Sequence, residues 1–178
     1  MSAVEIRTDR LLLRGWRESD RDAWAAMSVD PEVMRFFPSL LEREEADAVF
    51  DRVATALDER GWGLWAVDLD GEFQGFTGLQ PVPFEESFTP AVEIGWRLRR
   101  SAWGRGIATE AARASLDHAW TELGLDEVVA MAVGSNSRSL AVMERLGMTR
   151  VPGADFDHPR VPDGPLRRHV LFRIARPG

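Results

Sequence analysis

The sequence contains no cysteine, which excludes disulfide bonds, thiolate metal sites and a cysteine nucleophile. It also contains no apolar run near the ~20 residues that a membrane-spanning helix needs, and its N-terminus lacks the basic-then-apolar pattern of a signal peptide. The net charge of -7 argues against broad binding to a nucleic-acid backbone. We therefore expect a cytoplasmic protein that binds neither membrane nor nucleic acid.

The composition is that of a folded globular protein. Hydrophobic residues make up 44% of the chain and charged residues 29%, so the sequence is not disordered. A chain of 178 residues without internal repeats is most simply one domain, here residues 1–178.

A glycine-rich stretch at residues 103–110 (Trp-Gly-Arg-Gly-Ile-Ala-Thr-Glu) separates an apolar segment from a long region of helical spacing. A strand that runs through such a turn into a helix presents unpaired backbone N–H groups, which favour a phosphate. Gly104 and Gly106 suit the turn because glycine adopts unusual dihedrals, and Arg105 can add positive charge. A tight turn without a ligand explains this short pattern about as well.

The remaining pattern predicts alternating strands and helices. Strands are expected at 6–16, 63–69, 73–80, 91–98, 128–133, 148–151 and 168–174, and helices at about 20–28, 42–60, 105–123 and after Asn136 or Ser137. Ser19 or Asp20 can cap the first helix, Asp70-Gly71 is a hairpin signal, and a Pro- and Asp-rich loop is expected at 152–165.

A second motif, Asn-Ser-Arg-Ser at 136–139, lies about thirty residues beyond the glycine turn. Together with Glu-Ile-Gly-Trp at 93–96, the glycine turn, and the segments at 8–14 and 30–34, it resembles the GNAT acyl-CoA N-acyltransferases. The resemblance covers nearly the whole chain and is greatest to the ribosomal-protein N-terminal acetyltransferases. It implies a mixed α/β fold with a mostly antiparallel twisted sheet of about seven strands, whose fourth and fifth strands splay apart to admit acetyl-CoA.

The resemblance also implies where acetyl-CoA binds. Pantetheine is an extended chain of amides and can add to a splayed strand as a peptide adds to a sheet edge. The implied cofactor-binding residues are Trp96, Arg97 and Leu98 for pantetheine, Gly104, Arg105, Gly106, Ile107, Ala108 and Thr109 for the pyrophosphate, and Asn136. The family has Arg or Gln where this chain has Trp103, so the turn departs from the family pattern at its first position.

Two residues are candidates for catalysis. Glu93 is the candidate general base, acting through water, with an ion pair to an arginine as the alternative interpretation. Ser139 resembles the serine proposed to protonate the departing thiolate, although a serine in a first helical turn often only bonds backbone. Many GNAT enzymes use a tyrosine acid, but this sequence has no tyrosine and Met143 stands at that place, so solvent could supply the proton.

The implied acceptor is a primary amine, either a protein N-terminus or a small molecule. Trp24, Phe36, Phe37 and Phe84 could wall its pocket, although aromatic residues at such spacing usually belong to the core. His158 and His169 lie where the family's late loop borders the acceptor. No metal site is expected, because short turns before proline explain Asp155, Asp157 and His158. The family resemblance is also compatible with a homodimer.

Two other functions fit parts of the pattern. A non-catalytic CoA-binding module, with a regulatory or interaction role, would keep the cofactor residues without turnover. A nucleotide-binding α/β protein would share the glycine turn, but this chain has neither the lysine of a phosphate loop nor a complete G-x-G-x-x-G fingerprint.

Overall fold

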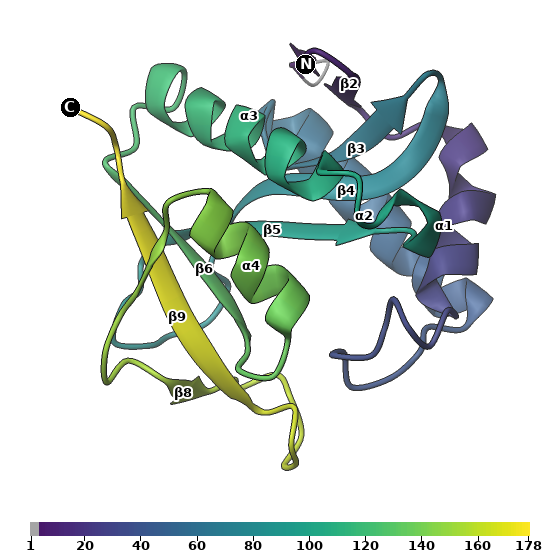
Figure 1. Cartoon of the computed structure of the whole chain (residues 1–178). Coiled ribbons are helices and arrows are strands. Elements are labelled where there is room, and N and C mark those ends of the chain that lie inside the picture. The colour runs from purple at the N-terminus through teal and green to yellow at the C-terminus, as the bar shows by residue number, and fades with distance from the viewer. Residues whose placement is uncertain (1–3) are drawn as a thin grey trace.

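The computed structural model describes residues 4–178, which form one twisted sheet with helices on both of its faces (Figure 1). The order of strands across the sheet is β1-β2-β3-β4-β5-β6-β9-β7, and β8 also pairs with β9. The strands are β1 (Ile6–Arg7), β2 (Leu11–Arg14), β3 (Leu64–Leu69), β4 (Glu72–Pro81), β5 (Val92–Leu98), β6 (Glu127–Val133), β7 (Thr149–Arg150), β8 (Phe156–Asp157) and β9 (Arg168–Ala175).

Four α-helices and two short 3₁₀ helices complete the described chain. They are η1 (Glu18–Asp20), α1 (Arg21–Ser28), α2 (Arg43–Arg60), η2 (Arg100–Ala102), α3 (Ile107–Thr121) and α4 (Ser137–Arg145). Among residues 4–178, no helix combines the length and the apolar character needed to cross a membrane. The predicted mixed α/β fold with a mostly antiparallel sheet is confirmed.

Alternation along the strands divides the core between the two faces of the sheet. Trp65 and Val67 of β3 pack in one cluster with residues of α3, such as Ala111. Ala66, between them, belongs to a second cluster that contains Trp24 of α1 and residues of α2. Because successive strand residues point to opposite faces, α1 and α2 cover the face opposite α3.

The structure corrects the sequence prediction at three places. The single strand expected at 6–16 is a hairpin, in which β1 and β2 pair antiparallel. The expected loop at 152–165 contains β8, which pairs with β9. Asp20 occupies the N-cap position of α1 but its side chain makes no capping bond to α1. Its carboxylate instead accepts hydrogen bonds from the guanidinium of buried Arg14 and from the backbone N–H of Arg17, at the start of η1.

The sheet opens between β5 and β6. These strands are parallel and pair at one register position only, Glu93 with Val129, whereas β4 pairs with β5 at seven positions, from Gly75–Leu98 to Pro81–Val92. The edge of β5 from Gly95 to Leu98 that faces β6 therefore has no strand partner. β5 and β6 are the fourth and fifth strands of the sequence prediction (91–98 and 128–133), so this opening is the expected splay.

Candidate functional site

A cavity of about 1090 Å³ lies at this opening. Its walls come from the end of β5, the N-terminus of α3, the first turns of α4 and the segment between α1 and α2. All but one of the residues predicted to bind the cofactor line it: Trp96, Arg97, Leu98, Gly104, Gly106, Ile107, Ala108, Thr109 and Asn136. The exception is Arg105, which is exposed at the turn.

The glycine turn lies at the wall of the cavity, where α3 begins. Gly104 and Gly106 have φ angles of +70° and +75°, in the left-handed region that side chains disfavour. A Cβ atom at Gly104 would meet nothing within 4 Å, so conformation rather than space requires glycine there. Gly106 is the N-cap of the 15-residue helix α3 and provides no side-chain cap. The first N–H groups of α3 therefore remain available to an anion.

The N-terminus of α4 forms the facing wall. The side-chain oxygen Oδ1 of Asn136 accepts a hydrogen bond from the backbone N–H of Ser139 at 3.3 Å and so caps the helix. Both Asn136 and Ser139 also line the cavity. The predicted cap is thus present, and the same two residues adjoin the space where a ligand would lie.

One cation in the cavity wall was missed by the sequence analysis. The guanidinium of Arg138, on α4, lies 4.1 Å from the ring centroid of Trp103, and both residues line the cavity. This contact is a cation–π interaction between residues 35 positions apart in the sequence. It places a positive charge beside the glycine turn, next to Trp103. No local sequence signal could indicate the pairing.

Glu93 lies on β5 but is not among the residues that line the cavity. Its Oε1 accepts a hydrogen bond from Nε2 of Gln80 at 2.6 Å. Burial raises the pKa of Glu93, and the bond from Gln80 and the charge of Arg160 act in the opposite direction. No ion pair among residues 4–178 includes Glu93, so the structure does not support the alternative interpretation as a salt-bridge residue.

Arg97 is on the same strand face as Glu93 but reaches the cavity. Its guanidinium lies 3.9 Å from the ring centroid of Phe37, 5.4 Å from Trp24 and 5.6 Å from Phe76. Its Nε and Nη1 atoms are inaccessible to solvent and have no hydrogen-bond partner. Burial lowers the pKa of Arg97 to about 10, and it remains a cation at neutral pH.

The aromatic residues expected near the acceptor separate into three places. Phe36 and Phe37 line the cavity, whereas Trp24 is a core residue that is 1% exposed. Phe84 lies elsewhere, with its ring centroid 4.8 Å from that of His158. His158 also lies 4.9 Å from His169, and burial followed by the charges of His169 and Arg160 lowers the pKa of His158 to about 4.

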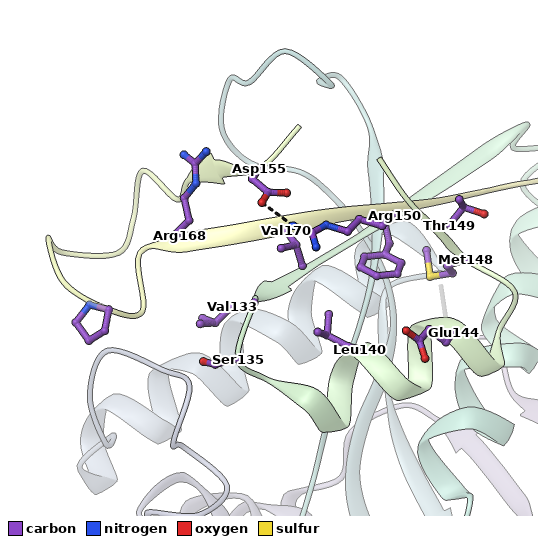
Figure 2. A pocket seen from close by; sticks show the side chains of 13 residues that line it. Val133, Ser135, Leu140, Glu144, Met148, Thr149, Arg150, Asp155, Arg168 and Val170 are labelled. Atoms are coloured by element: carbon purple, nitrogen blue, oxygen red, sulfur yellow. Dashed lines mark hydrogen bonds and ion pairs between the residues drawn. The ribbon is translucent and has the colours of Figure 1, made fainter. Parts of the chain in front are cut away.

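A second cavity, of about 730 Å³, lies between α4, β7 and β9 (Figure 2). It contains none of the predicted site residues. Its charged lining is partly neutralised, because Nη2 of Arg150 donates to Oδ2 of Asp155 at 2.7 Å. Within residues 4–178, no group of three or more His, Cys, Asp or Glu side chains could hold a metal ion. The larger cavity is therefore the candidate site.

Comparisons with known proteins identify relatives along the whole chain. The family model described as "Acetyltransferase (GNAT) domain" matches residues 10–149. The FsC-acetyl coenzyme A-N(2)-transacetylase of Aspergillus fumigatus is 34% identical over 96% of this chain and 76% of its own length. An acetyltransferase structure from Agrobacterium tumefaciens aligns with a TM-score of 0.79 at 29% identity, covering 99% of this chain and 96% of that one. Mycobacterium smegmatis RimJ, solved with a CoA-disulfide, aligns with a TM-score of 0.73 at 23% identity and 97% and 86% coverage.

Proposed function

The chain belongs to the GNAT acetyltransferase family and is an acetyl-CoA-dependent acyltransferase, and we propose that it transfers the acetyl group directly to a primary amine in a ternary complex. The observation that carries this proposal is the continuity of one cavity from the N-terminus of α3 to the unpaired edge of β5. One end of that cavity suits the diphosphate of acetyl-CoA, and the other end suits its pantetheine.

The residues present fit acetyl-CoA. The N–H groups of the glycine turn and of the first residues of α3, from Gly104 to Thr109, would bind the diphosphate, with Arg138 beside them. The backbone of Trp96 to Leu98 would bind the amides of pantetheine, because that edge of β5 lacks a strand partner. When bound, acetyl-CoA supplies an acetyl group activated as a thioester.

Residues of the chain also handle the proton of the acceptor amine and the negative charge that develops on the thioester oxygen. The acceptor nitrogen attacks the thioester carbonyl, a C–N bond forms, and the C–S bond breaks. Glu93 lies on β5 outside the cavity lining, so it takes the proton of the amine through intervening water, and Ser139 or solvent returns one to the departing sulfur. A backbone N–H of β5 steadies the oxyanion, an effect of roughly 3–4 kcal/mol when a single donor is lost. Without cysteine, no thiol-linked acyl-enzyme can form.

The need for Glu93 depends on the acceptor. An α-amine has an ordinary pKa of about 7.7–8.0, so much of it is neutral near physiological pH, whereas a lysine side chain at about 10.4 needs more help from a base. A protein N-terminus and a small-molecule amine both remain candidate acceptors. The relatives include an enzyme named FsC-acetyl coenzyme A-N(2)-transacetylase, a name that supports transfer of acetyl to a nitrogen.

The test is release of free thiol from acetyl-CoA in the presence of small amines and N-terminal peptides. The background of this thiol assay should be low, because the chain contains no cysteine or lysine side chain that could itself be acetylated. We expect turnover with at least one amine, with sequential kinetics. Ping-pong kinetics would contradict direct transfer, and calorimetry that detects no binding of CoA would contradict the cofactor site.

Variants separate an enzyme from a non-catalytic CoA-binding module. We expect Glu93→Gln and Ser139→Ala to lower kcat while CoA affinity is retained. Ser135→Ala is the matched control for Ser139→Ala, because Ser135 lies just before α4 but lines only the second cavity. Unchanged rates in both site variants would favour proton transfer by solvent, and an inactive wild type that binds CoA would favour the module.

A further inference from the structure

The guanidinium of Arg97 is a cation without an anionic partner at the wall of the candidate site. No hydrogen bond or ion pair among residues 4–178 involves it, although this part of the chain contains sixteen ion pairs elsewhere. Nε and Nη1 are both buried and unpartnered. No carboxylate of residues 4–178 lies within ion-pair distance of this charge, and burial lowers the pKa of Arg97.

The aromatic neighbours of Arg97 hold its guanidinium without satisfying its N–H groups. Phe37 contacts the guanidinium at 3.9 Å, a distance typical of stacking on the ring face. An arginine held in this way still presents its donors at the edge of its plane, in a fork that matches the two oxygens of a carboxylate. The environment is thus organised to orient a cation, and the acceptor atoms for its donors are missing.

The position of Arg97 separates it from the proposed diphosphate site. Trp24, Phe37 and Phe76 come from α1, the segment after it and β4, so the guanidinium lies on the face of the sheet that α1 and α2 cover. The glycine turn begins α3, which packs on the opposite face. An anion at Arg97 is therefore a different group from the phosphates expected at α3.

We propose that Arg97 binds a carboxylate carried by one of the two substrates, so that the enzyme prefers an acceptor amine with a free carboxylate or an acyl group that ends in one. This inference rests on acyl transfer as the proposed function and narrows its substrate class. Both sources present the same chemistry to Arg97, and two arms of one experiment distinguish them.

The acceptor arm compares amines that differ only in the charge of their far end. The probes are ω-amino acids from 3-aminopropionate to 6-aminohexanoate and the amide of each, with acetyl-CoA as donor. The acyl arm compares succinyl-CoA with butyryl-CoA, which have acyl chains of equal length, on one neutral amine. In one arm we expect the carboxylate to raise kcat/KM by about 10- to 100-fold, the effect of one charge-assisted hydrogen bond.

Variants assign the preference to Arg97. Arg97→Met should remove it, and Arg97→Lys should retain part of it. Arg35→Met is the matched control and should keep it, since Arg35 is an exposed arginine near the ring of Phe36 that does not line the cavity. The melting temperature of Arg97→Met should be unchanged or raised, because the variant removes an uncompensated charge from the free protein.

The outcomes distinguish this inference from the proposed function. Turnover with no carboxylate preference in either arm, or a preference that survives in Arg97→Met, would overturn the assignment and leave acyl transfer intact. Complete absence of turnover would contradict the proposed function instead. In that case glutarate decides the question for Arg97: it should raise the melting temperature of the wild type more than glutaramide does, and it should fail to do so in Arg97→Met.

Discussion

Breaking the buried ionic network around Arg14 should be strongly destabilising, and Arg14→Met tests this. Arg14 on β2 is 2% exposed. Its Nη1 and Nη2 donate to Asp20 at 2.7 and 2.9 Å, and its Nε donates to Asp68 at 2.8 Å. The arginine thus joins β2 to β3 and to the segment that begins α1. Methionine would leave both carboxylates buried beside an apolar side chain.

The size of the effect follows from the burial of both partners. Asp20 and Asp68 are 3% and 5% exposed, so water cannot replace the lost cation. Asp68 keeps only a distant ion pair with the exposed Arg17, at 3.8 Å. Removing one member of a buried ionic group costs about 3–5 kcal/mol. For a chain of this size each kcal/mol lowers the melting temperature by about 2–4 °C, which gives a decrease of about 6–20 °C.

The control is Arg21→Met, which removes an arginine that pairs with carboxylates at the surface. Arg21 bonds Glu18 and Asp51, which are 79% and 65% exposed, and such pairs contribute at most about 1 kcal/mol each. Thermal unfolding followed by circular dichroism measures both variants. Equal decreases would refute the argument from burial, as would failure of Asp20→Asn and Asp68→Asn to restore stability when combined with Arg14→Met.

Three further predictions follow from single residues. Burial raises the pKa of Glu93, so we expect the acid limb of kcat/KM above the usual range of glutamate and its loss in Glu93→Gln. The raised pKa also means that folding stability falls as pH rises through it, so this variant should gain stability relative to wild type toward high pH. The pKa of His158 is lowered from 6.5 to about 4, and the unfolded chain therefore binds a proton first as pH falls. Wild-type stability should decline between about pH 6.5 and 4, and His158→Phe should flatten that decline in urea titrations. Gly78→Ala should abolish folding, because its Cβ would lie 2.0 Å from the carbonyl oxygen of Gly63. Gly71→Ala, where a Cβ meets nothing within 4 Å, should cost only about 1–2 kcal/mol for its left-handed backbone, measured in the same way.

The helices, strands and turns could be predicted from the sequence because their signals lie in neighbouring residues. Period-two alternation located β5, and helical periodicity with a terminal glycine located α2, which ends before Gly61 at φ +77°. The Asp70-Gly71 turn has both φ angles positive, as a two-residue hairpin turn requires. The glycine turn, and Asn136 as a helix cap, were found for the same reason: their geometry depends on neighbouring residues.

Contacts between distant segments could not be predicted in this way. The pairing of Arg138 with Trp103 depends on how α4 packs beside the glycine turn, and the contact of Phe37 with Arg97 depends on the path of the chain between α1 and α2. Asp20 shows the limit directly: its position predicts a cap of α1, yet its carboxylate bonds Arg14 on β2 and the backbone N–H of Arg17 instead. A single sequence contains no local signal for such partners.

The distribution of charge along β5 connects stability with function. Glu93 and Arg97 lie four residues apart on one face of this strand, a separation of about 13 Å along the backbone, and neither forms an ion pair with any residue from 4 to 178. Burial raises the pKa of the Glu93 carboxyl and lowers the pKa of the Arg97 guanidinium, so in both cases the fold disfavours the charged form. Apolar residues there would stabilise the sheet, as they do at Ile94 and Leu98 on its other face. Perturbed groups of this kind gather at functional sites. Their location on the strand whose edge is unpaired therefore supports substrate binding along β5.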